Sequence, residues 1–237
     1  MTPPTEPDSF ALCERGADCA VLFARTPVPG RVKSRLLPTL SPEQACALHC
    51  AATNDTAALL AKTLPNAALW LFRSAESSTK DVMSFALPPR FRCAVQESGT
   101  LGDRMAAAFR RAFASGARRV VIFGSDSPTV PPSILPQAFR ALHESDVVIG
   151  PAADGGYYLI GCRRFDAAVF QDVEWSTPRT CTQTVANACR LGYSTTLLEG
   201  WFDIDTWDDV ERLLADARHG VPLPPHLAAF FAQFRSV

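Results

Sequence analysis

The 237-residue chain is long enough to bury a substantial core in one domain, and 47% of its residues are hydrophobic. Its formal net charge is -1, so no overall basic field favours nucleic acid or an anionic membrane as a partner. No stretch approaches the roughly 20 apolar residues that cross a bilayer, and the N-terminal stretch does not resemble a signal peptide. We therefore expect a cytoplasmic protein in which any anion binding is local.

The eight cysteines do not form a recognisable disulfide or metal framework. A chain of this length can fold without disulfides, so we expect reduced thiols. Cys46 and Cys50 are one helical turn apart with His49 beside them, but no second pair completes a soft-metal site. We interpret both cysteines as small buried side chains.

Short strand-like runs alternate with longer amphipathic segments along the chain. Ser41, Pro42 and Gln44 supply an N-cap, a first-turn proline and a capping-box partner for one helix, and Thr206 with Asp209 caps another. The expected strands are residues 19–24, 68–72, 92–96, 119–126, 146–150, 157–161 and 194–199. The expected helices follow Ser41, begin at Leu101, and cover 134–143, 177–191, 208–220 and the amphipathic stretch 225–237.

This alternation predicts an α/β fold with a mainly parallel sheet and helices on both faces. Residues 119–126 form a continuous apolar run, which is typical of a central parallel strand buried on both sides. We expect a flexible N-terminal arm at 1–18, one domain at 19–220 and a C-terminal amphipathic segment at 221–237. That last segment is expected to pack on the outside of the domain or on a partner, which leaves a homodimer as one arrangement.

A cationic loop follows the first strand. Gly30 and two prolines shape the turn, and Arg25, Arg31, Lys33 and Arg35 supply four positive charges. In an open α/β sheet such a loop lies at the carboxyl end of a strand, where ligands bind. A glycine-bearing turn with several cations can bind a di- or triphosphate, although the Walker spacing is absent and a solvated basic loop is the alternative.

Asp126 lies where the most apolar strand ends, within the sequence GSDSP. A carboxylate at that position faces the ligand crevice and can act in catalysis by holding a hard divalent cation, Mg²⁺ or Mn²⁺, beside phosphate groups. The alternative is a cap for the next helix. Asp203 and Asp205, in the late sequence WFDIDTWDD, favour the metal, because residues two apart in an extended stretch face the same side.

Asp154 precedes Gly155, Gly156 and Tyr157 in the sequence DGGY. The two glycines allow the backbone to approach a sugar or phosphate closely, so we assign the three following residues to substrate binding. Asp154 is a candidate general base for an acceptor hydroxyl. The alternative is a hairpin turn between two strands, in which Asp154 only favours the turn.

Two further motifs lie on the expected binding edge. Gln96, Gly102 and Arg104 belong to a strand-to-helix junction, QESGTLGDRM, and are candidates for phosphate or base contacts. Trp175, in EWST, is either a core residue or a platform on which a base or sugar stacks.

Taken in order, PVPGRVKSRL, QESGTLGDRM, GSDSP, GPAADGGYYLIG, EWST and DIDTWDD resemble a family of small GT-A-like nucleotide-diphospho-sugar transferases. The resemblance spans about residues 19–215. Members are described as glycosyltransferases, some of them assigned to arsenosugar biosynthesis or associated with radical-SAM genes. The layout is more distantly similar to molybdenum-cofactor guanylyltransferase and 2-phospholactate guanylyltransferase. Arg25 stands where the family often has Lys, and Ser34 where it usually has Thr; neither change removes a charge.

The resemblance implies a GT-A, Rossmann-like fold and a metal-dependent transferase. Glycosyl transfer from an NDP-sugar donor to a small-molecule acceptor would release NDP, with Asp154 as the base. Nucleotidyl transfer from an NTP to a phosphorylated small molecule would release pyrophosphate. A non-catalytic domain that binds a sugar nucleotide is a third hypothesis, which retention of Asp126, Asp203 and Asp205 disfavours.

Overall fold

The computed structural model describes residues 13–76 and 82–234. Most of the expected N-terminal arm, residues 1–12, lies outside the described residues. The remainder of that segment is not a free arm. The Gly16 N–H donates to the Gly116 carbonyl over 2.7 Å, and Asp18 already begins the first strand.

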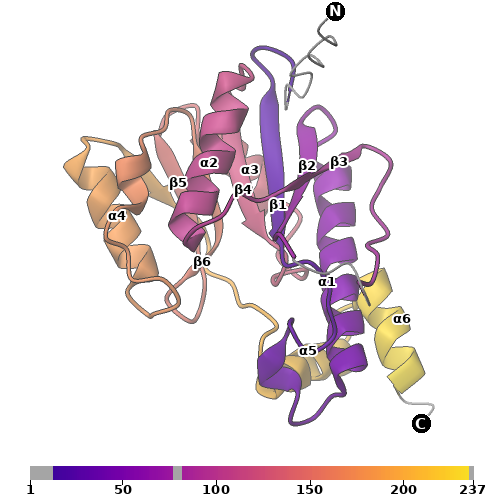
Figure 1. Ribbon diagram of the computed structural model, residues 1–237. Coiled ribbons are helices and arrows are strands. Elements are labelled where there is room, and N and C mark those ends of the chain that lie inside the picture. Colours follow the sequence, from indigo (N-terminus) through magenta and orange to yellow (C-terminus); the bar gives the residue numbers. More distant parts are fainter. Residues whose placement is uncertain (1–12, 77–81, 235–237) are drawn as a thin grey trace, which may run out of the picture.

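One seven-stranded sheet forms the centre of the molecule, in the order β3-β2-β1-β4-β6-β5-β7 (Figure 1). Every neighbouring pair is parallel except those of β6, which runs antiparallel to β4 and β5. The predicted α/β fold with a mainly parallel sheet is therefore confirmed. The strands are β1 Asp18–Ala24, β2 Ala68–Arg73, β3 Phe91–Val95, β4 Arg119–Gly124, β5 Val147–Pro151, β6 Tyr157–Cys162 and β7 Thr195–Leu197.

The helices α1, α2 and α5 begin at capping signals that the sequence provides. Capping boxes start α1 at Ser41, α2 at Thr100 and α5 at Thr206. Among the helices of the described chain, none is both long and apolar enough to span a membrane. The helices are α1 Pro42–Thr63, α2 Leu101–Ala114, α3 Ile134–Ala141, α4 Thr180–Arg190, α5 Trp207–Arg218 and α6 Pro225–Phe234, with short 3-10 helices η1 Ser34–Leu36 and η2 Ala167–Phe170.

Helix α4 begins three residues later than the sequence predicts. Ser176 has a left-handed backbone, with φ 60°, which ends any helical path before Thr177. Thr177 also precedes Pro178, and a residue before proline avoids the helical region. The segment 171–179 is therefore an irregular loop that faces the carboxyl edge of the sheet.

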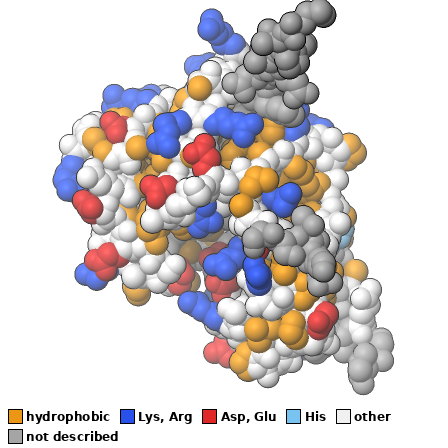
Figure 2. Space-filling view, viewed as in Figure 1, with side chains coloured by type: hydrophobic (Ala, Val, Ile, Leu, Met, Phe, Trp, Pro, Cys, Tyr) orange, Lys and Arg blue, Asp and Glu red, His pale blue; other side chains and the backbone are white. Residues whose placement is uncertain are grey.

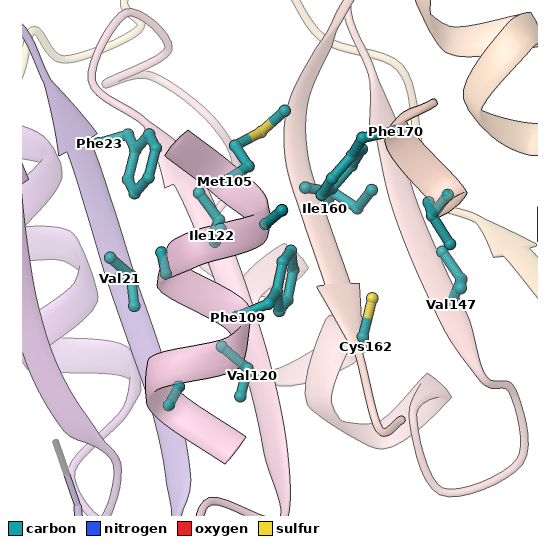
Figure 3. Close-up of a cluster of buried hydrophobic side chains, with 14 of the residues drawn as sticks. Val21, Phe23, Met105, Phe109, Val120, Ile122, Val147, Ile160, Cys162 and Phe170 are labelled. Carbon is teal, nitrogen blue, oxygen red and sulfur yellow. The ribbon is translucent and has the colours of Figure 1, made fainter. Parts of the chain in front are cut away.

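Apolar layers cover both faces of the sheet. On one face, α2 packs Met105 and Phe109 against Val120 and Ile122 of β4, as Figure 3 shows, and Phe170 of η2 extends the same layer. On the other face, α1 and α3 cover the alternate residues of the same strands. The continuous apolar runs predicted for a doubly covered sheet are thus explained.

A third apolar cluster forms a lobe at one end of the molecule. It joins η1, the first half of α1, α5 and α6, and its fully buried members include Leu36 and Ile204. In Figure 1 this lobe lies below the sheet, with α6 alongside α1. The C-terminal segment was expected to pack on the outside or on a partner, and α6 packs on the domain itself through Leu227 and Phe231.

Asp55 attaches α6 to α1. Its carboxylate, which is buried within α1, accepts the backbone N–H groups of His226 and Leu227 over 2.9 Å each. These amides belong to the first turn of α6, where no carbonyl within the helix can accept them. Burial raises the pKa of Asp55, and the two amide bonds oppose that shift.

Replacing Asp55 should therefore detach α6. In Asp55→Ala one part-buried and one buried N–H group lose their acceptor, and we expect a loss of about 2 kcal/mol in the free energy of unfolding. Urea denaturation and amide hydrogen exchange of residues 225–234 measure the effect. Asp208→Ala, which removes an exposed carboxylate from the first turn of α5, is the control and should change stability by a few tenths of a kcal/mol. Unchanged exchange in α6 would contradict the assignment.

Asp146 performs a similar structural role before β5. Its carboxylate accepts hydrogen bonds from Arg163, Arg164 and the backbone and side chain of Ser194. Burial alone would raise the pKa of Asp146, but these hydrogen bonds outweigh it and hold the pKa well below its usual range. The network fixes the amino ends of β5 and β7 and the carboxyl end of β6.

This depressed pKa predicts a loss of stability in acid. A carboxylate whose folded pKa lies below the unfolded value of about 3.9 stabilises the fold above that pH, and the contribution is lost as the pH falls below it. Asp146→Asn should be less stable at neutral pH, and its unfolding free energy should change less with pH below about 4. Parallel stability profiles for the variant and the natural protein would argue against this.

Candidate functional site

The candidate site lies at the carboxyl edge of the sheet. The loops after β1, β2, β3 and β4 all leave this edge because those strands are parallel, and the β5–β6 hairpin turns there as well. Figure 2 shows acidic and basic side chains together in a hollow between the body of the sheet and the lobe that contains α5. The edge therefore brings together the segments that carry most of the predicted site residues.

The structure joins Asp126 and Asp205 through Lys33. The Lys33 ammonium donates to Asp126 Oδ1 over 2.5 Å, to Asp205 Oδ1 over 3.0 Å and to the Ile204 carbonyl over 2.6 Å. Burial alone would lower the pKa of Lys33, but the two carboxylates outweigh it and raise the pKa. The Asp126–Asp205 pairing predicted from sequence thus corresponds to a real cluster.

Asp203 lies close to Asp126 and Asp205 and completes the acidic cluster. Its carboxylate accepts a hydrogen bond from the Ser127 hydroxyl. Burial, together with the charges of Asp126 and Asp205, raises the pKa of Asp203 to about 7. The charge of Lys33 acts in the opposite direction on Asp126 and outweighs burial, so the pKa of Asp126 is lowered.

Lys33 was predicted to bind phosphate, but in the structure it binds the acidic cluster. An ammonium has three donors, and all three are already used on the acidic cluster and the Ile204 carbonyl. The side chain is 3% exposed. Its neighbours in the loop do remain accessible, since Arg25, Gly30, Arg31 and Arg35 are all exposed, and Gly30 turns the chain with φ 77°.

The first-loop arginines are joined by a guanidinium from α2. Burial lowers the pKa of Arg104, and the positive charge of the nearby Arg25 lowers it further. Arg31 forms an ion pair with Glu76 over 2.7 Å. Two neighbouring guanidiniums with mutual repulsion favour an anion between them.

Gln96 connects strands and does not face a ligand. Its buried amide nitrogen donates to the carbonyls of Phe72 and Ala24, and its oxygen accepts from Arg104 over 2.9 Å. Every polar atom of that side chain is engaged within the protein. Its predicted role in nucleotide contact is corrected to that of holding Arg104 at the sheet edge.

Gly102 and Trp175, near this edge, pack against each other. A Cβ on Gly102 would lie 2.6 Å from the Trp175 ring, so the missing side chain makes room for that ring. Trp175 also packs against Phe170 in the apolar layer of α2. The structure places the two residues in contact with each other, and their predicted role in ligand binding stays a prediction.

The hairpin interpretation of residues 154–157 is correct for the backbone. Asp154 Oδ1 accepts the Gly156 N–H over 2.8 Å, which is the contact of a turn. A Cβ on Gly155 would lie 2.4 Å from the Pro178 backbone, and the Tyr157 hydroxyl points to Met105. These three residues thus make turn and packing contacts, and their predicted substrate contacts stay a prediction. Asp154 remains exposed at the edge.

Sequence patterns missed a cavity of about 480 Å³ beside the first loop. Leu71 and Arg73 of β2 lie opposite Cys93 and Val95 of β3, so all four face the cavity from one side of the sheet. Arg73 also donates to the Thr26 hydroxyl over 3.4 Å. The position of Arg73 at the end of a strand was the available signal, because its sequence context contains no motif.

His49 was also missed as part of the site region. It is buried in α1, and its Nε2 lies 3.0 Å from the carbonyl oxygen of Arg25, so Nε2 carries the proton and donates. Burial lowers the pKa of His49, which keeps the ring neutral. This contact fixes the start of the cationic loop. As predicted, Cys46 and Cys50 are buried.

The acidic cluster fits a hard divalent cation only in part. Among residues 13–76 and 82–234, no three acidic, histidine or cysteine side chains are already arranged as ligands around one point. Mg²⁺ and Mn²⁺ sites in transferases commonly use one or two carboxylates and complete the coordination with substrate phosphates and water. Asp126 and Asp205, whose side chains are 41% and 37% exposed, match that donor set.

A solved structure similar to this chain is that of a candidate nucleotide-diphospho-sugar transferase from Desulfovibrio desulfuricans G20. The two are 28% identical, with a TM-score of 0.81, and the match covers 93% of this chain and 96% of the other. A search of curated proteins found no match.

More distant structures share the fold. CMP:2-keto-3-deoxy-manno-octonic acid synthetase, solved with CTP, is 12% identical with a TM-score of 0.56, and the match covers 87% of this chain and all of that one. The 4-diphosphocytidyl-2C-methyl-D-erythritol synthase of Anaerococcus prevotii DSM 20548 is 11% identical with a TM-score of 0.54, over 86% and 99% of the two chains.

These likenesses support the GT-A-like, Rossmann-like fold predicted from the motifs. A family model matches residues 56–177, just over half of the chain, and includes β2 to β6 with the Asp126 and Asp154 segments. The chain therefore belongs to the family described as "Uncharacterized protein conserved in bacteria (DUF2064)".

Proposed function

We propose that this protein transfers a glycosyl group from an NDP-sugar to a small-molecule acceptor, with a divalent cation, Mg²⁺ or Mn²⁺, as cofactor. One observation carries the proposal. Asp126 and Asp205 come from distant parts of the sequence, yet both contact Lys33 and keep part of each carboxylate exposed at the edge where the arginines lie. The similarity to the candidate nucleotide-diphospho-sugar transferase supports this class of reaction.

We assign different roles in donor binding to the carboxylates and to the arginines. A cation held by Asp126 and Asp205 would offset the charge that builds on the leaving diphosphate. Arg25 and Arg104 lie close together and would bind the diphosphate oxygens, since guanidiniums match phosphate geometry. Arg31 and Arg35, which are exposed on the same loop, can extend that contact.

The cavity beside β2 and β3 suits the base of the donor. Its volume falls at the lower end of the range for small-molecule sites, and its walls are mostly apolar. Arg73 is a donor on its wall, and Thr26 lies next to Arg25 in the chain. A base in this cavity would therefore lie beside the guanidiniums that hold the phosphates.

Asp154 is the proposed base that accepts the proton of the acceptor hydroxyl. One of its oxygens is engaged with Gly156 N–H, which orients the carboxylate, and the side chain is exposed at the carboxyl edge. General-base catalysis needs a carboxylate that is ionised and within reach of the hydroxyl. The turn contact meets the need for orientation.

A second candidate is nucleotidyl transfer, which the number of guanidiniums favours. Arg25 and Arg31 lie in the loop after β1, and η1, the end of β2 and α2 add Arg35, Arg73 and Arg104. Together they carry more positive charge than a diphosphate requires. A triphosphate would use it, and a phosphate on the second substrate would then attack the α-phosphorus.

The two reactions differ in their leaving group. We expect the protein, incubated with Mn²⁺ or Mg²⁺, a panel of NDP-sugars and NTPs and candidate acceptors, to release NDP only when an NDP-sugar and an acceptor are both present. Coupled assays for NDP and for pyrophosphate follow the two products separately. Release of pyrophosphate without NDP would instead establish nucleotidyl transfer, and release of neither from any donor would contradict both.

Two asparagine variants separate metal binding from proton transfer. Asp126→Asn should weaken Mn²⁺ binding at least about 10-fold, because a neutral amide is a poor ligand for a hard cation. Asp154→Asn keeps the oxygen that accepts from Gly156, so Mn²⁺ affinity should stay unchanged while kcat falls about 100-fold or more. Electron paramagnetic resonance measures free Mn²⁺. Loss of Mn²⁺ binding in Asp154→Asn, or its retention in Asp126→Asn, would refute these roles.

A further inference from the structure

Lys33 and its two carboxylate partners differ sharply in exposure. The Lys33 side chain is 3% exposed, whereas those of Asp126 and Asp205 are 41% and 37% exposed. The ammonium therefore lies behind the carboxylates, on the side away from solvent. A phosphate or metal that arrives from solvent meets the carboxylates first.

The hydrogen bonds use only one oxygen of each carboxylate. Lys33 contacts Oδ1 of Asp126 and Oδ1 of Asp205. Among the described residues, neither Oδ2 atom accepts a hydrogen bond. Since the inner oxygens are covered by the ammonium, the exposed area of both side chains includes their outer oxygens.

We propose that Lys33 is a positioning residue for the metal site, which holds the inner oxygens of Asp126 and Asp205 so that their outer oxygens face an incoming divalent cation. It stays in place when the cation binds and does not contact phosphate. This inference rests on the metal-dependent function proposed above. It assigns Lys33 of the first loop to the carboxylates and not to the phosphates of the donor.

The backbone around Lys33 is built to keep the side chain there. Lys33 has a left-handed backbone, with φ 49°, a conformation that is unfavourable for a residue other than glycine. Val32 and Leu36 on either side are buried in the protein. The loop is thus fixed on both sides of the lysine, and the strain is compensated by the three hydrogen bonds of the ammonium.

Moving Lys33 away would leave several groups without partners. The Ile204 carbonyl would lose its hydrogen bond from the ammonium, and Asp126 and Asp205 would repel each other and the nearby Asp203. A cation that replaced Lys33 from the solvent side could not reach the Ile204 carbonyl behind the carboxylates. Retention of Lys33 avoids both costs.

Chemical labelling of the unmodified protein tests this arrangement. The chain contains three lysines, Lys33, Lys62 and Lys80, and Lys62 is exposed on α1. We expect reductive methylation, followed by mass spectrometry of peptides, to modify Lys33 at least about 10-fold more slowly than Lys62, because the Lys33 amine is buried and its carboxylate partners favour the unreactive charged form. Saturating Mg²⁺ or Mn²⁺ should leave that protection intact. Labelling of Lys33 at the rate of Lys62, with or without metal, would overturn the proposal.

A charge-matched pair of variants tests the effect on the metal. Lys33→Met should weaken Mn²⁺ binding in the absence of nucleotide by about 10-fold to 100-fold, as loss of a group that orients metal ligands does. Arg31→Met removes the same charge from the same loop without touching the carboxylates, and Mn²⁺ affinity should stay within about 3-fold. Tighter Mn²⁺ binding in Lys33→Met would show that the ammonium competes with the metal for the carboxylates, and unchanged binding would show that it has no effect on the metal. Either result would overturn the proposal.

The same measurements separate this inference from the proposed function. If the unmodified protein binds neither Mn²⁺ nor Mg²⁺, the metal site fails, and the positioning role fails with it. If it binds metal but exposes Lys33 on binding, only the positioning role fails. Circular dichroism confirms that each variant is folded, and the labelling result decides the question if Lys33→Met does not fold.

Discussion

The hydrogen bonds of Lys33 connect two parts of the molecule that are far apart in the sequence. The ammonium joins Asp126, which follows β4, to Asp205 and the Ile204 carbonyl, which precede α5. The Ile204 N–H donates in turn to the Asp126 carbonyl over 2.8 Å. The lobe is thereby fixed to the sheet edge by buried polar contacts, and three carboxylates can lie together because one cation offsets part of their repulsion.

Some charged side chains at the carboxyl edge of the sheet are accessible, and other side chains there only support them. Arg25 and Arg104 remain available, while Gln96 and His49 are used to hold the backbone and side chains near them. The hairpin follows the same division, since Gly155 makes room for Pro178 and Asp154 stays exposed. The supporting residues are thus held in place by contacts inside the protein.

Local signals predicted the elements well because they act over a few residues. Ser41, Thr206 and the apolar run of β4 specify a cap or a buried strand almost independently of the rest of the chain. The late start of α4 was missed because Ser176 adopts a left-handed backbone that its side chain does not require. The antiparallel β6 likewise follows from the hairpin at Asp154, for which the sequence left two interpretations open.

The sequence by itself determined the alternating α/β order, the carboxylates Asp126, Asp203 and Asp205, and the positive charge of the first loop. Only the tertiary structure decided what each charged or aromatic group touches. Lys33 faces carboxylates 93 and 172 residues away, and Trp175 fills the space left by Gly102. Spacing along the chain records which residues are neighbours in a helix or strand, whereas these contacts arise when separate elements pack, and so no local pattern contains them.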